Sequence, residues 1–570
     1  MANSISNTTT AKIILEERRH AVTYHDSNGA LATGPIVTYP KLELSTNGEP
    51  LVQPGPAAES KHILILGAGV SGLLVAWMLL DKGYRVSIFA DDWAWTKDFK
   101  KSRMTSQIAG ALWEFPPGGC GLTEIESVDD KWAKVQHYRE WALQSYEFYD
   151  KYAQISNLHE QRGASLGLRF ADLHQFFYRD LDNAEDALVA VEREKRDAIR
   201  TARDDGRMRG PMFTTYNEEG LLEKFKDVVN LDFRGQKFKS GYTHRAPIVN
   251  TDKGMAYLMA LVKAKGANLE TRSFESTIRS FGEGLLKRYH GHAIVNATGL
   301  GARDLAEDED VYPVRGAVLR VENTRRGLFR HLNDAYLVPA QKDSHEFPTK
   351  TIFIVPRSDD VLYVGSIIQT ENGKMNLSQE SPEVQDMWDR AGDFVKNLRH
   401  AGLAPEYPFA QGLRPFTKNN AKIRADEKAD FPLVHNYGHG GSGWTLGIGT
   451  ARCVLYILEK LLSPDDGAPD TNRVRPEIVR HRAWAVNCEI YPRPPTVLPS
   501  EDTSNIQPTM RQVQQEVQEV KQKVEDVKRE VQEVRQEVQG VNQEVRGVNQ
   551  KVQVLQSAPP TPRRSSEISD

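Results

Sequence analysis

The sequence predicts an α/β protein followed by a long C-terminal helix. From residue 59 to about residue 465, strand-like apolar runs alternate with helical patterns, which is typical of α/β architectures. Within this stretch, the apolar run His62–Leu66 leads directly into three closely spaced glycines and a helical segment. Near the C-terminus, valine recurs at alternating spacings of four and three residues, which is the pattern of a coiled coil.

Changes in composition indicate where these parts begin and end. Segments rich in proline and glycine precede residue 59 and follow residue 465, and we interpret them as linkers. Inside the α/β region, residues 124–156 and 182–206 are predicted to be helical. The predicted order is an N-terminal extension (1–58), the α/β domain (59–465), a proline-rich linker (466–508), the coiled coil (509–556) and a disordered tail (557–570).

Composition and charge exclude several classes of protein. Of the 570 residues, 39% are hydrophobic and 26% are charged, as in water-soluble globular proteins. A net charge of -4 does not favour nucleic acid or an anionic membrane as a partner. The three cysteines, Cys120, Cys453 and Cys488, have neither CxxC spacing nor the density of a disulfide scaffold. A reducing compartment is therefore expected, and no metal site is predicted.

The termini carry no recognisable targeting segment. The first twenty residues contain no apolar core of a signal peptide, and the sequence ends in SSEISD rather than an SKL-type peroxisomal signal. No run reaches the roughly 18 apolar residues that a membrane-spanning helix needs. A cytoplasmic location is the resulting expectation.

The glycine-rich segment has the spacing of a dinucleotide-binding motif. Gly67 is expected to make a tight turn, Gly69 to let the backbone approach a pyrophosphate, and Gly72 to let the helix pack closely on its strand. Val70 and Ser71 begin that helix, whose N-terminus favours negative charge. A second strand (85–89) is followed by Asp91, which is placed to accept hydrogen bonds from a ribose. The order of strand, glycines, helix, strand and acid predicts a Rossmann-like site.

A further apolar strand indicates which of the two common dinucleotides, NAD or FAD, is bound. Residues 292–305 (HAIVNATGLGARDL) contain a strand that ends in Ala297-Thr298-Gly299. Flavoproteins of the glutathione-reductase type return to the nucleotide at such a segment. The pattern therefore favours FAD over NAD.

Four further segments resemble the D-amino acid oxidase family of FAD-dependent oxidoreductases. Residues 104–115 (MTSQIAGALWEF) and 435–451 (HNYGHGGSGWTLGIGTA) resemble its flavin-contacting segments. Residues 311–323 (VYPVRGAVLRVEN) and 411–427 (QGLRPFTKNNAKIRADE) are similar to its RGQ strand and its GxRPxRPxxR segment. With the glycine motif, the five matches occur in the family's order over residues 60–463.

The resemblance implies a fold and a cofactor site. The expected fold is a glutathione-reductase-type FAD domain, built from residues 59–120, 265–310 and 410–465, interleaved with a mixed-sheet substrate domain. FAD is expected to bind non-covalently. The helix from residue 444 to about 462 would place positive backbone charge beside the flavin. The residues implied in FAD binding are Gly67, Gly69, Val70, Ser71, Gly72, Asp91, Thr105, Ser106, Gly110, Ala111, Phe274, Gly440, Gly441, Ser442 and Thr445. Phe274 is expected within a strand, and Trp113 is expected beside the flavin loop.

The resemblance also implies how a substrate is held and oxidised. Arg414 matches the family's arginine that binds the substrate carboxylate, and a guanidinium suits this role because its planar fork binds carboxylate bidentately. Gly441 matches the loop beside the reacting atoms. A hydride would then leave the amine-bearing carbon for the flavin, and oxygen would be reduced to hydrogen peroxide. The implied partners are a small amine or amino acid and oxygen.

Three positions depart from the family pattern. Phe353 stands where the family has a tyrosine that donates a second hydrogen bond to the substrate carboxylate. Tyr336, in an earlier segment, either approaches the pocket from another loop or is a core aromatic. Glu114, which follows Trp113, either contacts a cationic or hydroxylated substrate or faces solvent. The charged segment 182–210 is longer than the family needs and is either a lid or a solvated helix. Together these departures favour a larger carboxylate-bearing amine over a simple D-amino acid.

The C-terminal repeat predicts a homo-oligomer of unknown order. Two valine series of period seven continue over about six heptads between residues 513 and 555. A lone helix or a disordered tract is the alternative, because Gly540, Gly547 and the many valines lower helix propensity. Three functions therefore stay open: an amine or amino acid oxidase, a flavin dehydrogenase with another electron acceptor, and a coiled-coil scaffold that has lost catalysis.

Overall fold

The computed structural model describes the α/β region and four short strands before it. Side chains are described for residues 55–94, 103–110, 112–118, 135–156, 166–208, 213–343, 345–346, 348–418 and 420–463, apart from a few positions within these ranges. The predicted linker, coiled coil and tail lie outside the described residues, as do most of residues 1–58 and Ala111. In the N-terminal part, β1 (Ile13–Ile14) pairs with β4 (Glu43–Leu44), and β2 (His20–His25) pairs with β3 (Leu31–Val37).

A six-stranded sheet contains the glycine motif. Four of its strand pairs are parallel, and only the edge pair β21–β20 is antiparallel. All five residues of β5 are buried, as expected for a strand covered on both faces. The strand order is β12 (Asn268–Thr271), β6 (Arg85–Ala90), β5 (His62–Leu66), β13 (Ala293–Asn296), β21 (Leu433–Tyr437) and β20 (Lys422–Ala425).

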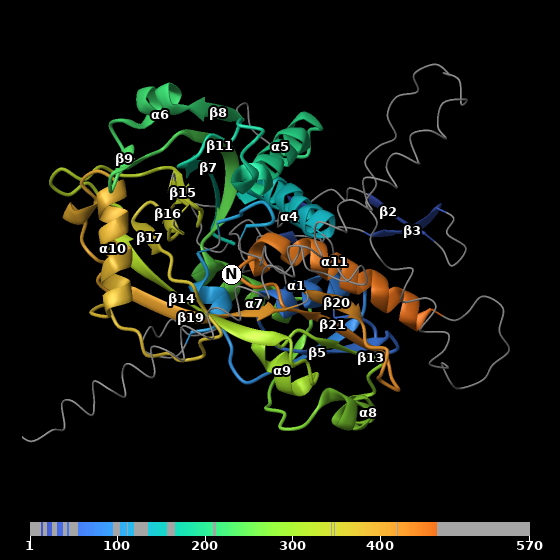
Figure 1. Cartoon of the computed structure of the whole chain (residues 1–570). Coiled ribbons are helices and arrows are strands. Elements are labelled where there is room, and N and C mark those ends of the chain that lie inside the picture. Colours follow the sequence, from blue (N-terminus) through green and yellow to red (C-terminus); the bar gives the residue numbers. More distant parts are fainter. Residues whose placement is uncertain are drawn as a thin grey trace, which may run out of the picture. The chain divides into compact units, whose positions relative to one another are not determined.

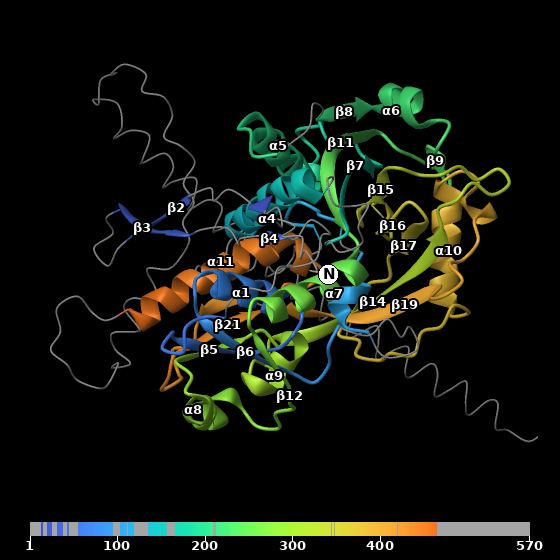
Figure 2. The same ribbon diagram turned by 180° about the vertical axis from the view of Figure 1, so that it is seen from behind.

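Helices cover both faces of this sheet (Figures 1 and 2). On one face, α1 (Val70–Asp81), α7 (Thr251–Ala264) and α11 (Gly443–Leu462) share one apolar core, which α4 (Val135–Ser156) extends. On the other face, α8 (Ile278–Tyr289) packs on a smaller core with side chains of β5, β13 and β21. The sheet is therefore the centre of a three-layer unit.

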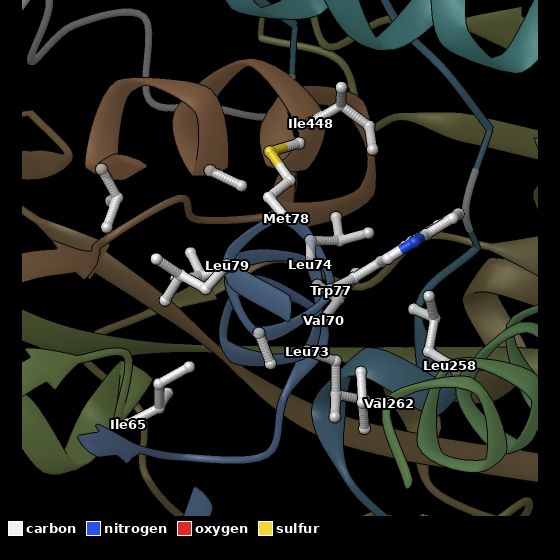
Figure 3. Packing of buried hydrophobic residues seen from close by; sticks show 14 of the residues in the cluster. Ile65, Val70, Leu73, Leu74, Trp77, Met78, Leu79, Leu258, Val262 and Ile448 are labelled. Carbon is white, nitrogen blue, oxygen red and sulfur yellow. The ribbon is translucent and has the colours of Figure 1, made fainter. Parts of the chain in front are cut away.

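Helix α1 is apolar on all sides because helices surround it. Ten of its twelve residues are buried. Figure 3 shows Leu258 and Val262 of α7 and Ile448 of α11 around its side chains. Trp77 meets Phe148 of α4 edge to face, with ring centroids 5.6 Å apart. This packing fixes the helix whose N-terminus follows the glycine motif.

A larger, mixed sheet forms the second half of the molecule. Its nine strands pair antiparallel except β15 with β7. Helices α6 (Glu218–Phe225) and α10 (Pro382–Phe394) enclose an aromatic-rich core on one of its faces. The order is β18 (Gln369–Thr370), β14 (Val311–Glu322), β17 (Val361–Gly365), β16 (Ile352–Pro356), β15 (Ala335–Val338), β7 (Leu168–Phe177), β11 (Ser240–Val249) and β8 (Thr214–Asn217), with β19 (Phe409–Thr417) also pairing with β14.

The remaining elements are short, except for α5 (Ala190–Asp204). They comprise α2 (Thr105–Ile108), α9 (Ala302–Leu305), the hairpin β9 (Asp232–Phe233) with β10 (Gln236–Lys237), and the 3-10 turns η2 (Ala187–Val189), η3 (Gly299–Gly301) and η4 (Leu398–His400). No helix among the described residues is long and apolar enough to cross a membrane.

The predicted α/β class and mixed sheets are confirmed, with two corrections. The helix expected from residue 182 begins only after residue 186, because Asp180, Asn183 and Asp186 each accept a backbone N–H within two residues and form turns. Phe274 was expected within a strand, but β12 ends at Thr271. The part of the predicted helix before residue 135 lies outside the described residues.

Candidate active site

A cavity of about 720 Å³ lies where the two sheets meet. At one end it is lined by residues at or just after the carboxyl ends of β5, β6, β13 and β21, such as Gly67, Asp91, Thr298 and Asn436. Parallel α/β sheets bind nucleotides at this edge. Strands β14, β16 and β19 of the larger sheet line the other end.

Close contacts require two of the three glycines of the motif, Gly67 and Gly72. Gly67 has φ +104°, and a Cβ there would lie 2.4 Å from the carbonyl oxygen of Ala297. A Cβ on Gly72 would lie 2.1 Å from the carbonyl oxygen of Gly67, so this glycine lets α1 pack against the turn. A Cβ on Gly69 would meet no protein atom closer than 3.4 Å. Because Gly69 lines the cavity, its missing side chain leaves room for a ligand.

An aromatic and a carboxylate mark the outer end of this part of the cavity. Phe274 stacks on Phe281 with ring centroids 4.4 Å apart, and the guanidinium of Arg272 lies 5.1 Å from the centroid of Phe274. Ser273 donates a hydrogen bond to the exposed Asp91. Phe274, Arg272 and Asp91 all line the cavity, as an adenosine-binding end requires.

The loop around α2 is fastened to both sheets. Ser106 accepts a hydrogen bond from the backbone N–H of Val70 (3.1 Å), and Thr105 donates one to the carbonyl of Leu413 in β19 (3.0 Å). The buried guanidinium of Arg357 donates to the carbonyls of Ala109 (2.7 Å) and Gly110 (3.3 Å). These bonds hold Thr105, Ser106 and Gly110 along the cavity wall.

The N-terminus of α11 opens onto the cavity. Gly440 has φ +57°, and Gly440, Gly441, Ser442 and Thr445 all line the space. Ser442 donates a hydrogen bond to the carbonyl of Gly118 (3.1 Å). The 20-residue helix places unpaired backbone N–H groups and the positive end of its dipole here, which favours negative charge on a bound group.

Two polar residues beside this helix were missed at the sequence level. His439 is buried, with Nδ1 3.4 Å from the hydroxyl of Ser71 and Nε2 3.3 Å from that of Thr450. Burial lowers its pKa to about 4, so the imidazole is neutral. Asn436 is fully buried and lines the cavity, yet its amide finds no hydrogen-bond partner among the described residues. The sequence signal that could have revealed them is a polar residue in or just after an apolar strand: Asn436 lies within β21 and His439 in the loop that follows.

These features fit the dinucleotide that the sequence implies. The turn after β5 offers backbone N–H groups and an open glycine face, and Asn436 offers an amide that needs a partner. Gly67, Gly69, Val70, Ser71, Thr105 and Ser106 would hold the pyrophosphate side of FAD, and Gly440, Gly441, Ser442 and Thr445 the flavin side. No group of three His, Cys, Asp or Glu residues that could hold a metal occurs within the described part of the chain.

Arg414 projects into the cavity from β19. It donates to the carbonyl of Ile367 (3.1 Å) and to the hydroxyl of Ser366 (3.0 Å). No carboxylate among the described residues pairs with it, and burial lowers its pKa to about 10. A Cβ on Gly316, across the β14–β19 pair, would lie 2.3 Å from Arg414 Nη1, so this glycine makes room for the guanidinium.

Of the two aromatic candidates, Phe353 and Tyr336, only Phe353 lines the cavity. Phe353 lines the cavity, and its ring edge contacts Gly110. Tyr336 does not line the cavity, so the prediction that it approaches the pocket as a site residue is wrong. It is 5% exposed and packs on His174 (centroids 5.1 Å apart) within the core of the larger sheet. β-strand alternation explains this, since the adjacent Leu337 is the cavity-lining residue.

Glu114 lies at the cavity and not in open solvent. Its carboxylate accepts a hydrogen bond from Lys195 of α5 at 2.8 Å, and Glu192 of the same helix also lines the cavity. Helix α5 buries Lys195, Arg196, Ile199 and Ala202. The charged segment 182–210 is therefore not a wholly solvated helix, and its helix packs on the rest of the domain. Trp113, expected beside the flavin loop, is instead a core residue that donates to the carbonyl of Ala142.

Comparisons with known proteins show the family to which the chain belongs. A family model described as FAD dependent oxidoreductase (DAO) matches residues 62–457. The D-amino-acid oxidase of Schizosaccharomyces pombe is 26% identical over 418 residues, which cover 70% of this chain and 97% of that protein. The D-amino-acid oxidase of Streptomyces coelicolor is 28% identical, over 69% and 94% of the two chains. That of Rubrobacter xylanophilus is 33% identical, but over only 38% of this chain and 58% of its own length. Because the family model covers more than half of the 570 residues, the chain belongs to the DAO family of FAD-dependent oxidoreductases.

Proposed function

We propose that this protein oxidises a carboxylate-bearing amine to an imine, with oxygen as the final electron acceptor. The observation that carries the proposal is Arg414, a partly buried guanidinium in the cavity with no carboxylate partner among the described residues. A carboxylate bound there would gain a charge-assisted hydrogen bond of about 1.5–3 kcal/mol. The relatives named D-amino-acid oxidase support an amino acid-like substrate.

The chain's contribution is to position and to stabilise charge. FAD, when bound, would supply the acceptor for the two electrons and the hydrogen removed from the amine-bearing carbon, and oxygen would be reduced to hydrogen peroxide. Arg414 anchors the carboxylate, with Ser366 and the carbonyl of Ile367 fixing the guanidinium plane. The N-terminus of α11 would lie beside the flavin side of FAD and favour negative charge there. The imine product then takes up water and releases ammonia.

Phe353 distinguishes this site from the family pattern. A phenyl ring cannot donate a hydrogen bond, so Arg414 and its partners hold the carboxylate without a tyrosine hydroxyl. This supports the larger carboxylate-bearing amine that the sequence favours, because binding energy must come from other parts of the substrate.

Peroxide release from the FAD-loaded protein tests the proposal. A panel of carboxylate-bearing amines, including ordinary D-amino acids, should contain substrates whose turnover Arg414→Ala reduces by at least about 100-fold in kcat/KM. Arg330→Ala, at an exposed position, is the matched control and should leave kcat/KM unchanged. Equal activity of Arg414→Ala and the parent would contradict the proposal. Reoxidation of the reduced flavin in air more slowly than turnover would exclude oxygen as the acceptor.

We also propose that residues 509–556 assemble the protein into a homo-oligomer. The support is the valine repeat in the sequence alone. A chain ending at residue 508 should be monomeric by light scattering while keeping its FAD and its kcat/KM. A parent protein that is itself monomeric would contradict this proposal.

A further inference from the structure

The cavity has a second charged wall, distant in sequence from Arg414. Glu114 and Glu192 both line it, the latter from the first turn of α5. Behind them, Lys195 donates to Glu114 at 2.8 Å, and its Nζ lies 3.8 Å from Glu192 Oε2. Lys195 is 1% exposed and does not line the cavity, so the groups facing the cavity are carboxylates.

The charges of this wall do not balance. One ammonium is shared by two carboxylates, which leaves one excess negative charge when both are ionised. Glu192 Oε2 is buried and accepts no hydrogen bond among the described residues, since 3.8 Å from Lys195 is too long for one. Burial raises the pKa of Glu192. A carboxylate in this setting gains strongly from a further cationic donor.

A buried hydroxyl beside the same cluster is also unsatisfied. Tyr242 of β11 is fully buried, and its hydroxyl finds no hydrogen-bond partner within the described ranges. It interacts electrostatically with Lys195, Glu192 and Glu114, which places it next to the cluster. Tyr242 does not itself line the cavity, but buried polar groups are rarely left unpaired, so two such groups in one cluster beside the cavity point to a missing polar partner.

We infer that Glu114 and Glu192 form a subsite for a second, cationic nitrogen of the substrate. The inference rests on the proposed function and narrows its substrate class to carboxylate-bearing amines that carry a distal ammonium or guanidinium group. Arg414 on β19 would hold the carboxylate and Glu192 on α5 the distal cation, since both residues line the same cavity. Helix α5, longer than the family pattern requires, would then serve substrate selection.

Binding of inert probes tests the subsite without requiring turnover. The probes are straight-chain carboxylates of four to six carbons, each with and without a terminal amine, titrated into the oxidised FAD-loaded protein by flavin absorbance. At one or more lengths, the terminal amine should tighten binding roughly 10- to 100-fold, the value of a charge-assisted hydrogen bond. Glu192→Gln should abolish this preference. Glu194→Gln, on the same helix but exposed and paired with Arg139, should retain it.

Each other outcome is decisive. If the plain carboxylates bind through Arg414 but the terminal amine never tightens binding, the subsite is wrong and the proposed function stands. If Glu192→Gln weakens the binding of probes with and without the terminal amine equally, the subsite is also wrong. Glu192 would then affect the site as a whole and would not recognise the amine. If no probe binds and Arg414→Ala changes nothing, the proposed function fails and the subsite with it. Should Glu192→Gln lose FAD, Glu114→Gln replaces it, and the parent's own preference remains decisive.

Discussion

The two ends of the cavity are built in different ways. At the nucleotide end, recognition comes mainly from backbone, with Gly67, Gly69 and Gly72 shaping one turn between β5 and α1. At the proposed substrate end, the side chains that line the cavity come from separate elements: Arg414 on β19, Phe353 on β16 and Glu192 on α5. A backbone site is encoded within a few consecutive residues, whereas a side-chain site depends on the packing of the whole larger sheet.

The difference teaches where sequence variation can act. Every pyrophosphate needs the same backbone N–H groups and the same close approach of the backbone, so the sequence of the nucleotide end has little freedom to vary. Phe353 on β16 and Glu192 on α5 lie outside the turn after β5, so their side chains can change without disturbing that turn. We therefore expect substitutions at the two ends to separate cofactor binding from substrate binding.

The largest effect is expected at the nucleotide end. In Gly67→Ala, the new Cβ would strike the carbonyl of Ala297 at 2.4 Å, and alanine is disfavoured at φ +104°. FAD affinity should fall by more than about 100-fold, or the protein should fail to accumulate in folded form. Flavin content of the purified protein and its Kd by fluorescence measure this.

Gly83→Ala is the matched control for that change. Gly83 also has a positive φ (+85°), but a Cβ there would meet nothing within 4 Å. The backbone strain alone should cost about 1–2 kcal/mol of unfolding free energy and leave FAD binding intact. If both variants lost FAD equally, the close contact at Gly67 would not be the cause.

The contrast between a backbone site and a site of separate side chains also explains how well the sequence predicts each end of the cavity. The turn after β5, the start of α11 and the cavity positions of Arg414 and Phe353 were all expected, because each lies inside a contiguous motif. Tyr336 was misplaced, since which face of β15 meets the cavity is set by its pairing with β7 and β16. The partnership of Glu114 with Lys195 joins residues 81 positions apart, and no local pattern reveals it.

At the substrate end, Gly316→Ala should separate substrate from cofactor. The added methyl group would lie 2.3 Å from Arg414 Nη1 and force the guanidinium away from Ser366. We expect KM to rise roughly 10- to 100-fold, because a charge-assisted hydrogen bond is lost or bent, while the Kd for FAD changes little. Gly373→Ala, whose Cβ would keep 3.7 Å from Pro313, is the control. Loss of FAD in Gly316→Ala would mean that the two ends are not independent.

The junction between the ends lies at Gly110 and Phe353. A Cβ on Gly110 would lie 2.5 Å from Phe353 Cζ, so Gly110→Ala must displace either the flavin-side loop or the ring. We expect about a tenfold loss of kcat/KM, smaller than at Gly316 because the ring can move. The double variant Gly110→Ala/Phe353→Leu should regain most of this loss, since leucine leaves space for the methyl group. Losses that simply add would show that the two residues do not interact.

A further expected effect, on stability and not on activity, is a pH dependence from His439. Burial lowers its pKa to about 4, whereas the unfolded chain takes up the proton near pH 6.5. Below pH 6.5 the unfolded state therefore binds more protons, and the free energy of unfolding falls as pH is lowered towards 4. Between pH 7 and pH 5 this one group should cost about 2 kcal/mol, because each pKa unit corresponds to about 1.4 kcal/mol.

His439→Gln should remove that part of the pH dependence. Glutamine can still bond to Ser71 and Thr450 but does not titrate, so urea unfolding at pH 7 and pH 5 should show a smaller difference than in the parent. His331→Gln, at an exposed histidine, serves as the control. An unchanged pH dependence in His439→Gln would mean that other buried groups, such as His244 with its pKa lowered to about 4, dominate the acid response. Because His439 lies next to Ser71 of α1, the helix that starts within the glycine motif, a positive result would link acid stability to the nucleotide end and not to the substrate end.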